Sequence, residues 1–307
     1  MTEPASPNVA VVVPTHNRPE LLRIAVDAIL AQDYLGRLDV VVVFDGTEPN
    51  QTLVHKEDRR SVSVTSNNRT PGLPGGRNTG IDHFPDATYL AFCDDDDIWH
   101  PTKVTAQVAQ LEHNPDAALS TTGIVIDFEG AESPRSSPKA ELTYEGLVLD
   151  RTTEAHPSTF MFRRAALVDI GAVDEVIPGG YSEDYDYLLR TACVGRIVCI
   201  REPLVTVRWG RTSYFTRRWQ VIVEAQRYLM RKHNAFTKSR RAEARIRGQI
   251  AFALAAMGAR GEAFQEVGVI LVRWPFGMRW PIAVLVALKV TKPEQVLSLA
   301  HKFGRGI

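Results

Sequence analysis

The chain reads YLAFCDDDDIW over residues 89–99, an apolar run followed by four consecutive aspartates. The run 89–92 predicts a buried strand, and residues that follow such a strand lie where open α/β sheets bind ligands. Four adjacent like charges repel one another, and a bound cation would offset them. Mg²⁺ and Mn²⁺ accept carboxylate ligands and keep positions open for phosphate oxygens. A metal and phosphate site is therefore one interpretation, and a solvated acidic turn is the other.

The sequence before this stretch alternates between strand and helix patterns. The β-branched run 9–13 is apolar throughout, which is typical of a parallel strand covered on both faces. Further strands are predicted at 39–44 and 61–65, and a helix is predicted from Asn17, as its N-cap, to about Gln32. A strand, a helix and a strand at this spacing form a right-handed βαβ unit. The pattern predicts an α/β fold, Rossmann-like, with a mostly parallel sheet and flanking helices.

Other elements follow from the same periodicities and from the positions of glycine and proline. We expect a helix around 51–60, and a loop at 68–76 that ends where Arg77 opens a helix. Residues 130–140 contain two prolines and several serines and are expected to form a flexible loop. The remaining expectations are helices at 101–113 and 183–192 and strands at 119–128, 158–162 and 197–200.

Charge is divided unevenly along the 307 residues, although the formal net charge is zero. Residues 1–200 contain 16 Lys and Arg against 30 Asp and Glu, whereas residues 201–307 contain 20 against 6. An acidic first part suits a site that binds a cation, and a basic tail suits an anionic partner surface. We therefore expect an α/β domain at 1–210 and a basic helical region at 211–307.

The basic tail combines arginines, aromatic residues and a short apolar stretch. It carries ten Lys and Arg between 217 and 247, and it continues as WPFGMRWP over 274–281 before an apolar helix at 282–290. Such a mixture favours contact with an anionic membrane surface, and a helical cap packed on the rest of the chain is the alternative. The sequence contains no recognised nucleic-acid-binding module, so nucleic acid is not an expected partner.

Three features bear on the compartment. The three cysteines, at 93, 193 and 199, lack the spacing of a zinc or redox motif, and their odd number argues against a disulfide framework. The first residues lack the basic and apolar regions of a signal peptide. The apolar run 281–288 is far shorter than the roughly 20 residues that span a membrane. The expected location is the cytoplasm, with peripheral contact at the inner face of the membrane.

Two common nucleotide-binding motifs are missing. The first strand is followed by PTHN instead of G-x-G-x-x-G, and GGRNTG at 75–80 lacks the Lys-Ser/Thr end of a P-loop. NAD enzymes and P-loop NTPases are therefore disfavoured. A second acidic motif, SEDYD at 182–186, opens a predicted helix. Its carboxylates either cap that helix or include a general base that accepts a proton from an attacking hydroxyl.

Four stretches in this order resemble the inverting glycosyltransferases of family 2, which have the GT-A fold. They are VVVPTHNR at 11–18, FDG at 44–46, AFCDDDDIWHP at 91–101 and SEDYDYLLR at 182–190. The GAVDE stretch at 171–175 is also similar to the family's G-G-F-D-E motif. The resemblance covers about residues 8–210 and implies a GT-A domain there, with a C-terminal helical extension.

The resemblance implies a donor-binding role for residues at several strand ends. The loop after the first strand would cradle the nucleoside, Asp45 would read the base edge, and Arg77 would lie near the diphosphate. The implied nucleotide-sugar-binding residues are Pro14, Thr15, His16, Asn17, Asp45, Arg77, Asp94 and Asp95.

The resemblance also implies a metal site and a catalytic base. Asp94 and Asp96 match the outer residues of the family's D-x-D motif, with Asp96 as the direct ligand of Mn²⁺ or Mg²⁺. Asp184 matches the general base, and Glu183 is its acidic neighbour in the catalytic pair. Two departures stand out. Phe44 replaces an acid that the family often has, and Trp209-Gly210 follow Arg208 where many members carry a histidine.

The implied reaction is the transfer of a hexose from a nucleoside-diphosphate sugar, with a UDP-sugar favoured, to a hydroxyl of a saccharide or lipid-linked acceptor. Cell-surface polysaccharide or glycolipid synthesis is the implied setting. Two other functions remain open on the residues alone. A nucleotidyltransferase also uses a metal and aspartates on a Rossmann-like sheet, and a non-catalytic nucleotide-sugar-binding module would keep the aspartates without needing Asp184.

Overall fold

The computed structural model describes residues 6–209 and 218–302, and describes side chains up to residue 299. The contacts within the chain define two compact units, which we describe separately. Unit 1 comprises Met1–Tyr144, Thr152–Glu175 and Glu183–Trp209, and unit 2 comprises Glu145–Arg151, Val176–Ser182 and Gly210–Ile307. The expected boundary at 210/211 and Arg217 of the basic tail lie outside the described residues.

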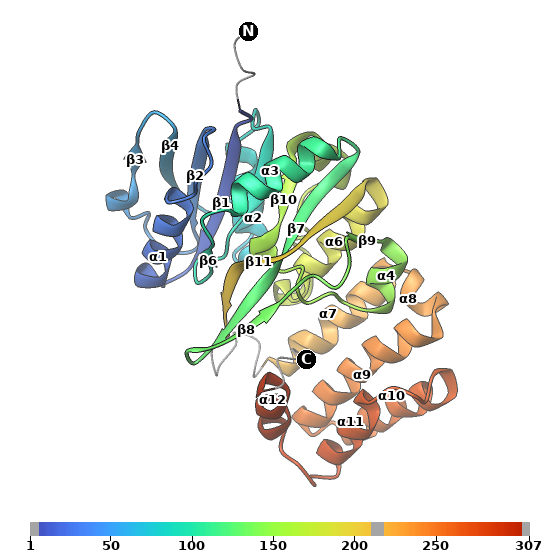
Figure 1. The fold of residues 1–307 in the computed structure, drawn as a ribbon. Helices are drawn as coiled ribbons and strands as arrows, with labels where there is room; N and C mark the ends of the chain where they lie inside the picture. The colour runs from blue at the N-terminus through green and yellow to red at the C-terminus, as the bar shows by residue number, and fades with distance from the viewer. Residues whose placement is uncertain (1–5, 210–217, 303–307) are drawn as a thin grey trace. The chain divides into compact units, whose positions relative to one another are not determined.

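Unit 1 is built on one mixed sheet with the strand order β3-β4-β2-β1-β5-β10-β7-β11-β6 (Figure 1). The strands β4, β2, β1 and β5 run parallel, whereas β10 is antiparallel to both of its neighbours. Their bounds are Val9–Thr15 (β1), Leu38–Phe44 (β2), His55–Lys56 (β3), Arg60–Ser66 (β4), Tyr89–Phe92 (β5), Ile98–Trp99 (β6), Ala117–Phe128 (β7), Ala131–Arg135 (β8), Glu141–Leu142 (β9), Met161–Arg163 (β10) and Arg196–Arg208 (β11).

Helices cover both faces of the parallel part of this sheet. Those of unit 1 are α1 (Pro19–Leu30), α2 (Leu73–His83), α3 (Lys103–His113), α5 (Leu167–Ile170) and α6 (Glu183–Val194). Helix α4 (Tyr144–Leu149) begins with the last residue of unit 1's first segment and otherwise belongs to unit 2. The βαβ unit and the mostly parallel sheet predicted from the sequence are confirmed.

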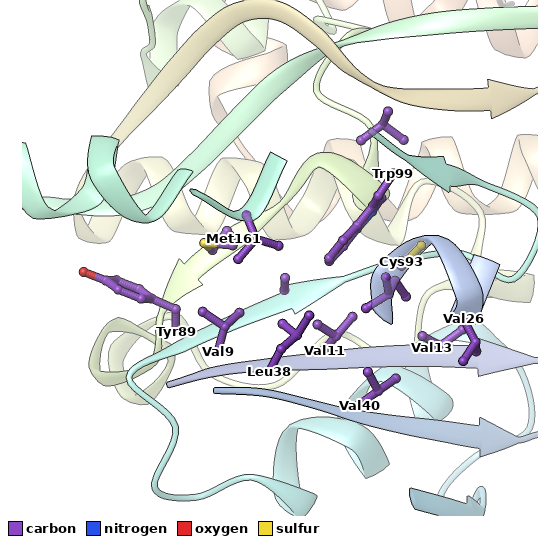
Figure 2. Packing of buried hydrophobic residues seen from close by; sticks show 14 of the residues in the cluster. Val9, Val11, Val13, Val26, Leu38, Val40, Tyr89, Cys93, Trp99 and Met161 are labelled. Atoms are coloured by element: carbon purple, nitrogen blue, oxygen red, sulfur yellow. The ribbon is translucent and has the colours of Figure 1, made fainter. Parts of the chain in front are cut away.

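The two faces separate because strand side chains alternate. Val9, Val11 and Val13 of β1 point to the face covered by α1 and α3, where Figure 2 shows them packed beside Leu38 and Val40 of β2. Helices α1 and α3 bury apolar residues on this face at helical spacing. Burial of each such side chain contributes roughly 1.5–3 kcal/mol to folding. Positions that face the core are therefore apolar, and the strands appear in the sequence as apolar runs.

The other face receives α2 and α6, and a glycine sets how closely α2 approaches. A Cβ atom added to Gly80 of α2 would lie 2.1 Å from Cγ1 of Val12 in β1, so only glycine fits there. On the same face, the Phe162 ring of β10 packs against Phe92 of β5 at 5.4 Å and against Tyr187 of α6 at 5.2 Å between centroids. This packing brings the start of α6 to the sheet edge where β1 and β5 end.

Unit 2 is helical in its described residues. Its helices after residue 217 are α7 (Trp219–Lys232), α8 (Ala235–Lys238), α9 (Arg240–Met257), α10 (Arg260–Arg273), α11 (Arg279–Ala287) and α12 (Pro293–Lys302). Helix α9 is the centre of this unit, since α7, α10 and α11 all pack against it. Among the described residues, no helix combines the length and the apolar character needed to cross a bilayer.

Five sequence-based expectations about local structure are wrong. The strand expected at 158–162 is one of them, since Pro157–Thr159 is a 3₁₀ turn and the strand β10 begins at Met161. Asn17 is not the N-cap of α1, because it has a φ of 54° and Arg18 takes that position. Residues 51–60 do not form a helix but a short 3₁₀ turn, Gln51–Leu53, and then β3. The expected loop at 130–140 contains β8, which pairs with β7. Arg77 lies inside α2 instead of opening it. In two of these cases a neighbouring strand supplies backbone partners that local sequence does not reveal.

Candidate functional site

The four aspartates after β5 alternate between the interior and the surface. Asp95 and Asp97 are buried, whereas Asp94 and Asp96 are half-buried. Asp95 and Asp96 lie in a turn that the Asp97 amide closes on the Asp94 carbonyl at 3.2 Å, so the four side chains point in different directions. Each buried carboxylate is held by groups from another part of the chain, and Asp94 and Asp96 are the two that retain exposed surface.

Asp95 joins this segment to the end of β1. Its Oδ2 accepts a hydrogen bond from the Thr15 hydroxyl at 2.7 Å, and the His16 amide lies 3.4 Å away. The Arg18 guanidinium reaches Oδ1 of Asp95 at 3.2 Å and Oδ2 of Asp96 at 2.5 Å. Burial raises the pKa of Asp95, although the hydrogen bond from Thr15 and the charge of Arg18 favour its ionised form. Three of the residues predicted to bind the donor, Thr15, His16 and Asp95, therefore contact one another.

Asp97 is 1% exposed and faces a turn from a different part of the chain, Pro157–Thr159. The Ser158 hydroxyl donates to Oδ2 of Asp97 at 2.5 Å, and Nδ1 of His156 lies 3.3 Å from the same oxygen. Burial lowers the pKa of His156, but Asp97 outweighs it and raises that pKa to about 9. Nδ1 of His156 also lies 3.4 Å from the Ser158 amide, so this nitrogen faces two groups of the site at nearly equal distances.

Arg77 of α2 connects Asp94 to the start of α6. Its side chain is 1% exposed, and Nη2 donates to Oδ1 of Asp94 at 2.6 Å while Nη1 donates to Oε1 of Glu183. The guanidinium also lies over the Phe92 ring, 5.6 Å from its centroid. Burial would lower the pKa of Arg77, but Glu183 and Asp94 raise it further, so the residue stays charged. Its contact with a diphosphate stays a prediction.

One guanidinium balances several carboxylates here, and the excess negative charge shows in Glu183. Burial raises the pKa of Glu183 to about 7, with Asp184 and Asp94 adding to the effect and Arg77 opposing it. Asp184, the predicted base, is the second residue of α6 and is half-buried. Its charge contributes to the raised pKa of both Arg77 and His156. The predicted base and the aspartate segment thus belong to one electrostatic cluster.

Asp45, at the end of β2, organises the loop between β4 and α2. Its Oδ1 accepts from Nδ2 of Asn67 at 2.8 Å, and its Oδ2 accepts from the Gly72 amide at 2.9 Å. His16 reaches the Asp45 carbonyl through Nδ1 at 2.7 Å, and Asn17 lies beside Nε2 of His16 at 3.2 Å. Contact of Asp45 with a base stays a prediction.

A second carboxylate holds the same loop and was not singled out from the sequence. Glu175 accepts hydrogen bonds from Nδ2 of Asn78 at 2.6 Å and from the Thr70 amide at 3.2 Å, and Arg69 lies 3.2 Å from its Oε1. Burial would raise the pKa of Glu175, but the bonds from Thr70 and Asn78 lower it. The similarity of 171–175 to a family motif pointed to this region but gave its glutamate no role.

The residues present fit a divalent metal. Ligand atoms of Asp94, Asp97 and His156 come within 4.8 Å of one another, and carboxylate oxygens with one imidazole are donors that first-row divalent ions accept. Asp94 belongs both to this group and to the pair of metal ligands predicted from the sequence, Asp94 and Asp96. Asp96 instead faces Arg18, and burial together with Asp97 and Asp94 raises the pKa of Asp96 to about 7. A bound cation would favour the ionised form of these carboxylates.

The remaining predicted residues lie around this cluster. Pro14 is buried in β1 and lies close to α2. A Cβ atom added to Gly76 of α2 would lie 3.1 Å from the Cβ of Pro14. His16 and Asn17 are exposed just beyond the strand. The structure therefore brings the ends of β1 and β5 together with the starts of α2 and α6. Sequence reasoning missed His156 and Ser158, because a single histidine before a proline carries no periodic signal.

This arrangement of strand-end carboxylates on a mostly parallel sheet is that of a GT-A glycosyltransferase fold. The chain belongs to glycosyl transferase family 2, whose family model matches residues 10–171.

Known proteins similar to this chain agree with that assignment. This chain is 23% identical over 165 residues to the UDP-Glc:alpha-D-GlcNAc-diphosphoundecaprenol beta-1,3-glucosyltransferase WfgD of Escherichia coli. The match covers 50% of this chain and 64% of that protein. The chain spans 64% of the length of the first curated relatives that it matches.

Two solved structures share the fold. Residues 1–349 of S. aureus TarS in complex with UDP superpose with a TM-score of 0.56 at 17% identity, covering 97% of this chain and 92% of that one. The mannosyltransferase PcManGT from Pyrobaculum calidifontis, in complex with GDP-Man and Mn²⁺, gives a TM-score of 0.58 at 18% identity, covering 98% and 88%.

Proposed function

We propose that this chain transfers a hexose from a nucleoside-diphosphate sugar to an acceptor hydroxyl with inversion at the anomeric carbon. The observation that carries the proposal is the pair of bonds made by Arg77. One guanidinium bonds both Asp94, after β5, and Glu183, which precedes Asp184 in α6. A donor held at the aspartate segment would therefore lie within reach of a carboxylate able to accept a proton.

The proposed reaction is a single displacement. The acceptor oxygen forms a bond to the anomeric carbon, the bond from that carbon to the diphosphate oxygen breaks, and the acceptor proton moves to the Asp184 carboxylate. The nucleoside diphosphate leaves with the bonding electrons. A divalent metal held by Asp94 with Asp96, or with Asp97, would supply positive charge for the leaving group.

We favour a UDP-sugar as donor and a lipid-linked saccharide as acceptor, in the synthesis of a surface polysaccharide or glycolipid. TarS was solved with UDP, and the name of WfgD describes transfer from UDP-Glc to a diphosphoundecaprenol-linked sugar. PcManGT, in contrast, was solved with GDP-Man. The donor assignment is therefore tested with a panel of nucleotide sugars instead of one.

The test measures nucleoside diphosphate released from each donor in the presence of Mn²⁺ or Mg²⁺, with diphosphoundecaprenol-linked GlcNAc as acceptor. Asp184→Asn should lower the rate by about 10²–10⁴, which is what general-base assistance contributes, while donor affinity by calorimetry stays unchanged. Asp116→Asn, at an exposed carboxylate outside the site, is the matched control. Full activity in Asp184→Asn would contradict the assignment of the base. Release of pyrophosphate from a nucleoside triphosphate and a sugar 1-phosphate, supplied in a parallel assay, would instead indicate a nucleotidyltransferase, and donor binding without turnover would indicate a binding module.

We also propose that unit 2 contacts the cytoplasmic face of the membrane, where such an acceptor lies. Residues 271–292 contain four basic residues and no acidic residue, and Lys289 and Lys292 are exposed. Phe276 and Met278, between α10 and α11, are 80% and 75% exposed. The exposed apolar side chains of this segment are Leu271, Val272, Trp274, Phe276, Met278, Leu285, Leu288 and Val290. Aromatic and apolar groups flanked by cations suit the interface of an anionic bilayer.

Sedimentation with vesicles tests this contact. Wild-type protein should pellet with vesicles rich in phosphatidylglycerol at low salt and stay in the supernatant with phosphatidylcholine. The double variant Phe276→Ser and Met278→Ser should lose binding, whereas Val168→Ser, at a residue 77% exposed in unit 1, should keep it. Unchanged binding by the double variant would refute the assignment, and a concentration-dependent dimer without vesicle binding would identify the surface as an interface between two copies.

A further inference from the structure

A short turn from the middle of the chain braces the aspartate segment from behind. The turn Pro157–Thr159 follows His156, and Ser158 is completely buried within it. Ser158 bonds three parts of the segment 94–99. Its hydroxyl accepts from the Asp94 amide at 2.9 Å and donates to Asp97, and its carbonyl accepts from the indole N–H of Trp99 at 2.9 Å. One serine therefore fixes the segment near its beginning, in its middle and at its end.

The hydroxyl of Ser158 can serve both bonds only in one orientation. It has a single proton, which it donates to Asp97, so that a lone pair faces the Asp94 amide. That orientation depends on Asp97 remaining in place as an acceptor. Asp97 is 1% exposed, and a carboxylate that deep is retained only when its oxygens have partners. The second partner of Asp97 Oδ2 is Nδ1 of His156.

We propose that His156 is a positioning residue for the metal and donor site, and that it acts by holding Asp97, and through Ser158 the backbone of Asp94. The inference rests on the proposed function. It differs from direct metal ligation, because His156 acts through the contacts of its Nδ1 with the Asp97 carboxylate at 3.3 Å and with the Ser158 amide at 3.4 Å. Without these contacts the Asp97 carboxylate and the turn that carries Ser158 lose their support, and the Asp94 carboxylate loses its fixed direction.

The test compares His156→Ala with His156→Asn. The asparagine amide places a polar group near the position of the imidazole Nδ1 and can contact Asp97 and the Ser158 amide, whereas alanine offers neither contact. We would measure Mn²⁺ binding by electron paramagnetic resonance, with the metal alone and with UDP or GDP added. His156→Ala and Ser158→Ala should weaken Mn²⁺ binding by about 10–100-fold, which is usual for loss of a group that orients a metal ligand. His156→Asn should recover most of the affinity, and His113→Ala, at an exposed histidine at the end of α3, should leave it unchanged.

Three results would overturn the proposal. Wild-type Mn²⁺ affinity in His156→Ala, with an unchanged circular dichroism spectrum, would show that the contacts of Nδ1 are dispensable. An equal loss in His156→Asn and His156→Ala would show that the imidazole itself ligates the metal. Absence of Mn²⁺ binding by the wild-type protein would also refute it, while metal-independent release of nucleoside diphosphate would leave the transferase proposal standing.

Discussion

Replacing Glu183 with Gln removes one negative charge from the crowded start of α6 without removing the side chain. Glu183 is 4% exposed, and burial raises its pKa from the usual 4.5 to about 7 even though Arg77 opposes the shift. Because the single guanidinium of Arg77 also faces Asp94 and Asp184, it cannot neutralise all three carboxylates. The metal-free protein should therefore hold a proton on Glu183 near neutral pH, and glutamine should imitate that protonated state.

The folded protein holds this proton more tightly than the unfolded chain does. A carboxyl whose pKa is raised on folding adds stability below its unfolded pKa, and that stability is lost as the pH rises through its folded pKa. With pKa values of 4.5 unfolded and about 7 folded, Glu183 costs the wild-type protein on the order of 2–3 kcal/mol between about pH 5 and pH 8. Because the side chain is buried, solvent screening reduces this figure little. The Gln variant lacks a titrating group here and should not incur this loss.

Urea denaturation at about pH 5 and pH 8, followed by circular dichroism, measures the effect. The free energy of unfolding of Glu183→Gln relative to wild type should rise by about 2–3 kcal/mol between the two pH values. The matched control is Glu20→Gln, at an exposed glutamate in the first turn of α1, which should show no such change. A constant difference between variant and wild type at both pH values would refute the reasoning, and so would a variant that is less stable than wild type at pH 8.

Three further changes test other parts of unit 1 and the fold. Gly80→Ala should destabilise by about 1–3 kcal/mol in thermal unfolding, because its Cβ would overlap Val12, while Gly261→Ala, in open space on α10, should be neutral or stabilising. Lys103→Met should raise the melting temperature more at pH 6 than at pH 10. Burial lowers the pKa of Lys103 from 10.5 to about 7, so the lysine destabilises the wild-type protein most below pH 7, where the buried amine is charged, and little near pH 10. An equal effect of the substitution at both pH values would contradict this. Glu175→Gln should speed hydrogen exchange in the loop between β4 and α2, and unchanged exchange would show that the loop does not depend on this carboxylate.

The sequence predicted those parts of the fold where burial dominates. The apolar runs at 9–13, 39–44 and 61–65 correspond to β1, β2 and β4, because a strand covered on both faces is apolar at every position or nearly so. Edge strands were missed, as at 51–60, since β3 is short, half-exposed and defined by pairing with β4. The order of β10 and β7 beside β5 was equally beyond local patterns.

The candidate site was predictable to the extent that its residues form local motifs. The aspartate run and the acidic start of α6 stood out because charge is concentrated in each. The alternation of Asp94 to Asp97 between surface and interior was not visible, because four identical residues carry no pattern. His156 and Ser158 were missed for a different reason: Ser158 and its partner Asp97 are 61 residues apart, and only the fold brings them together.

The hydrogen bond between Arg77 and Glu183 has a consequence for synthesis of the protein. The two residues are 106 positions apart, and a ribosome adding about 5–20 residues per second needs roughly 5–20 s to cover that distance. During this interval a nascent chain could form β1, β2, β4 and β5, but packing α2 on β1 and β2 would bury the Arg77 guanidinium with Asp94 bonded to Nη2 and no acceptor from Glu183 for Nη1. Burying a charge without its full set of partners is unfavourable. The emergence of α6 therefore sets the earliest moment at which the nascent domain can close, and a chain arrested before residue 183 should remain a substrate for chaperones and proteases.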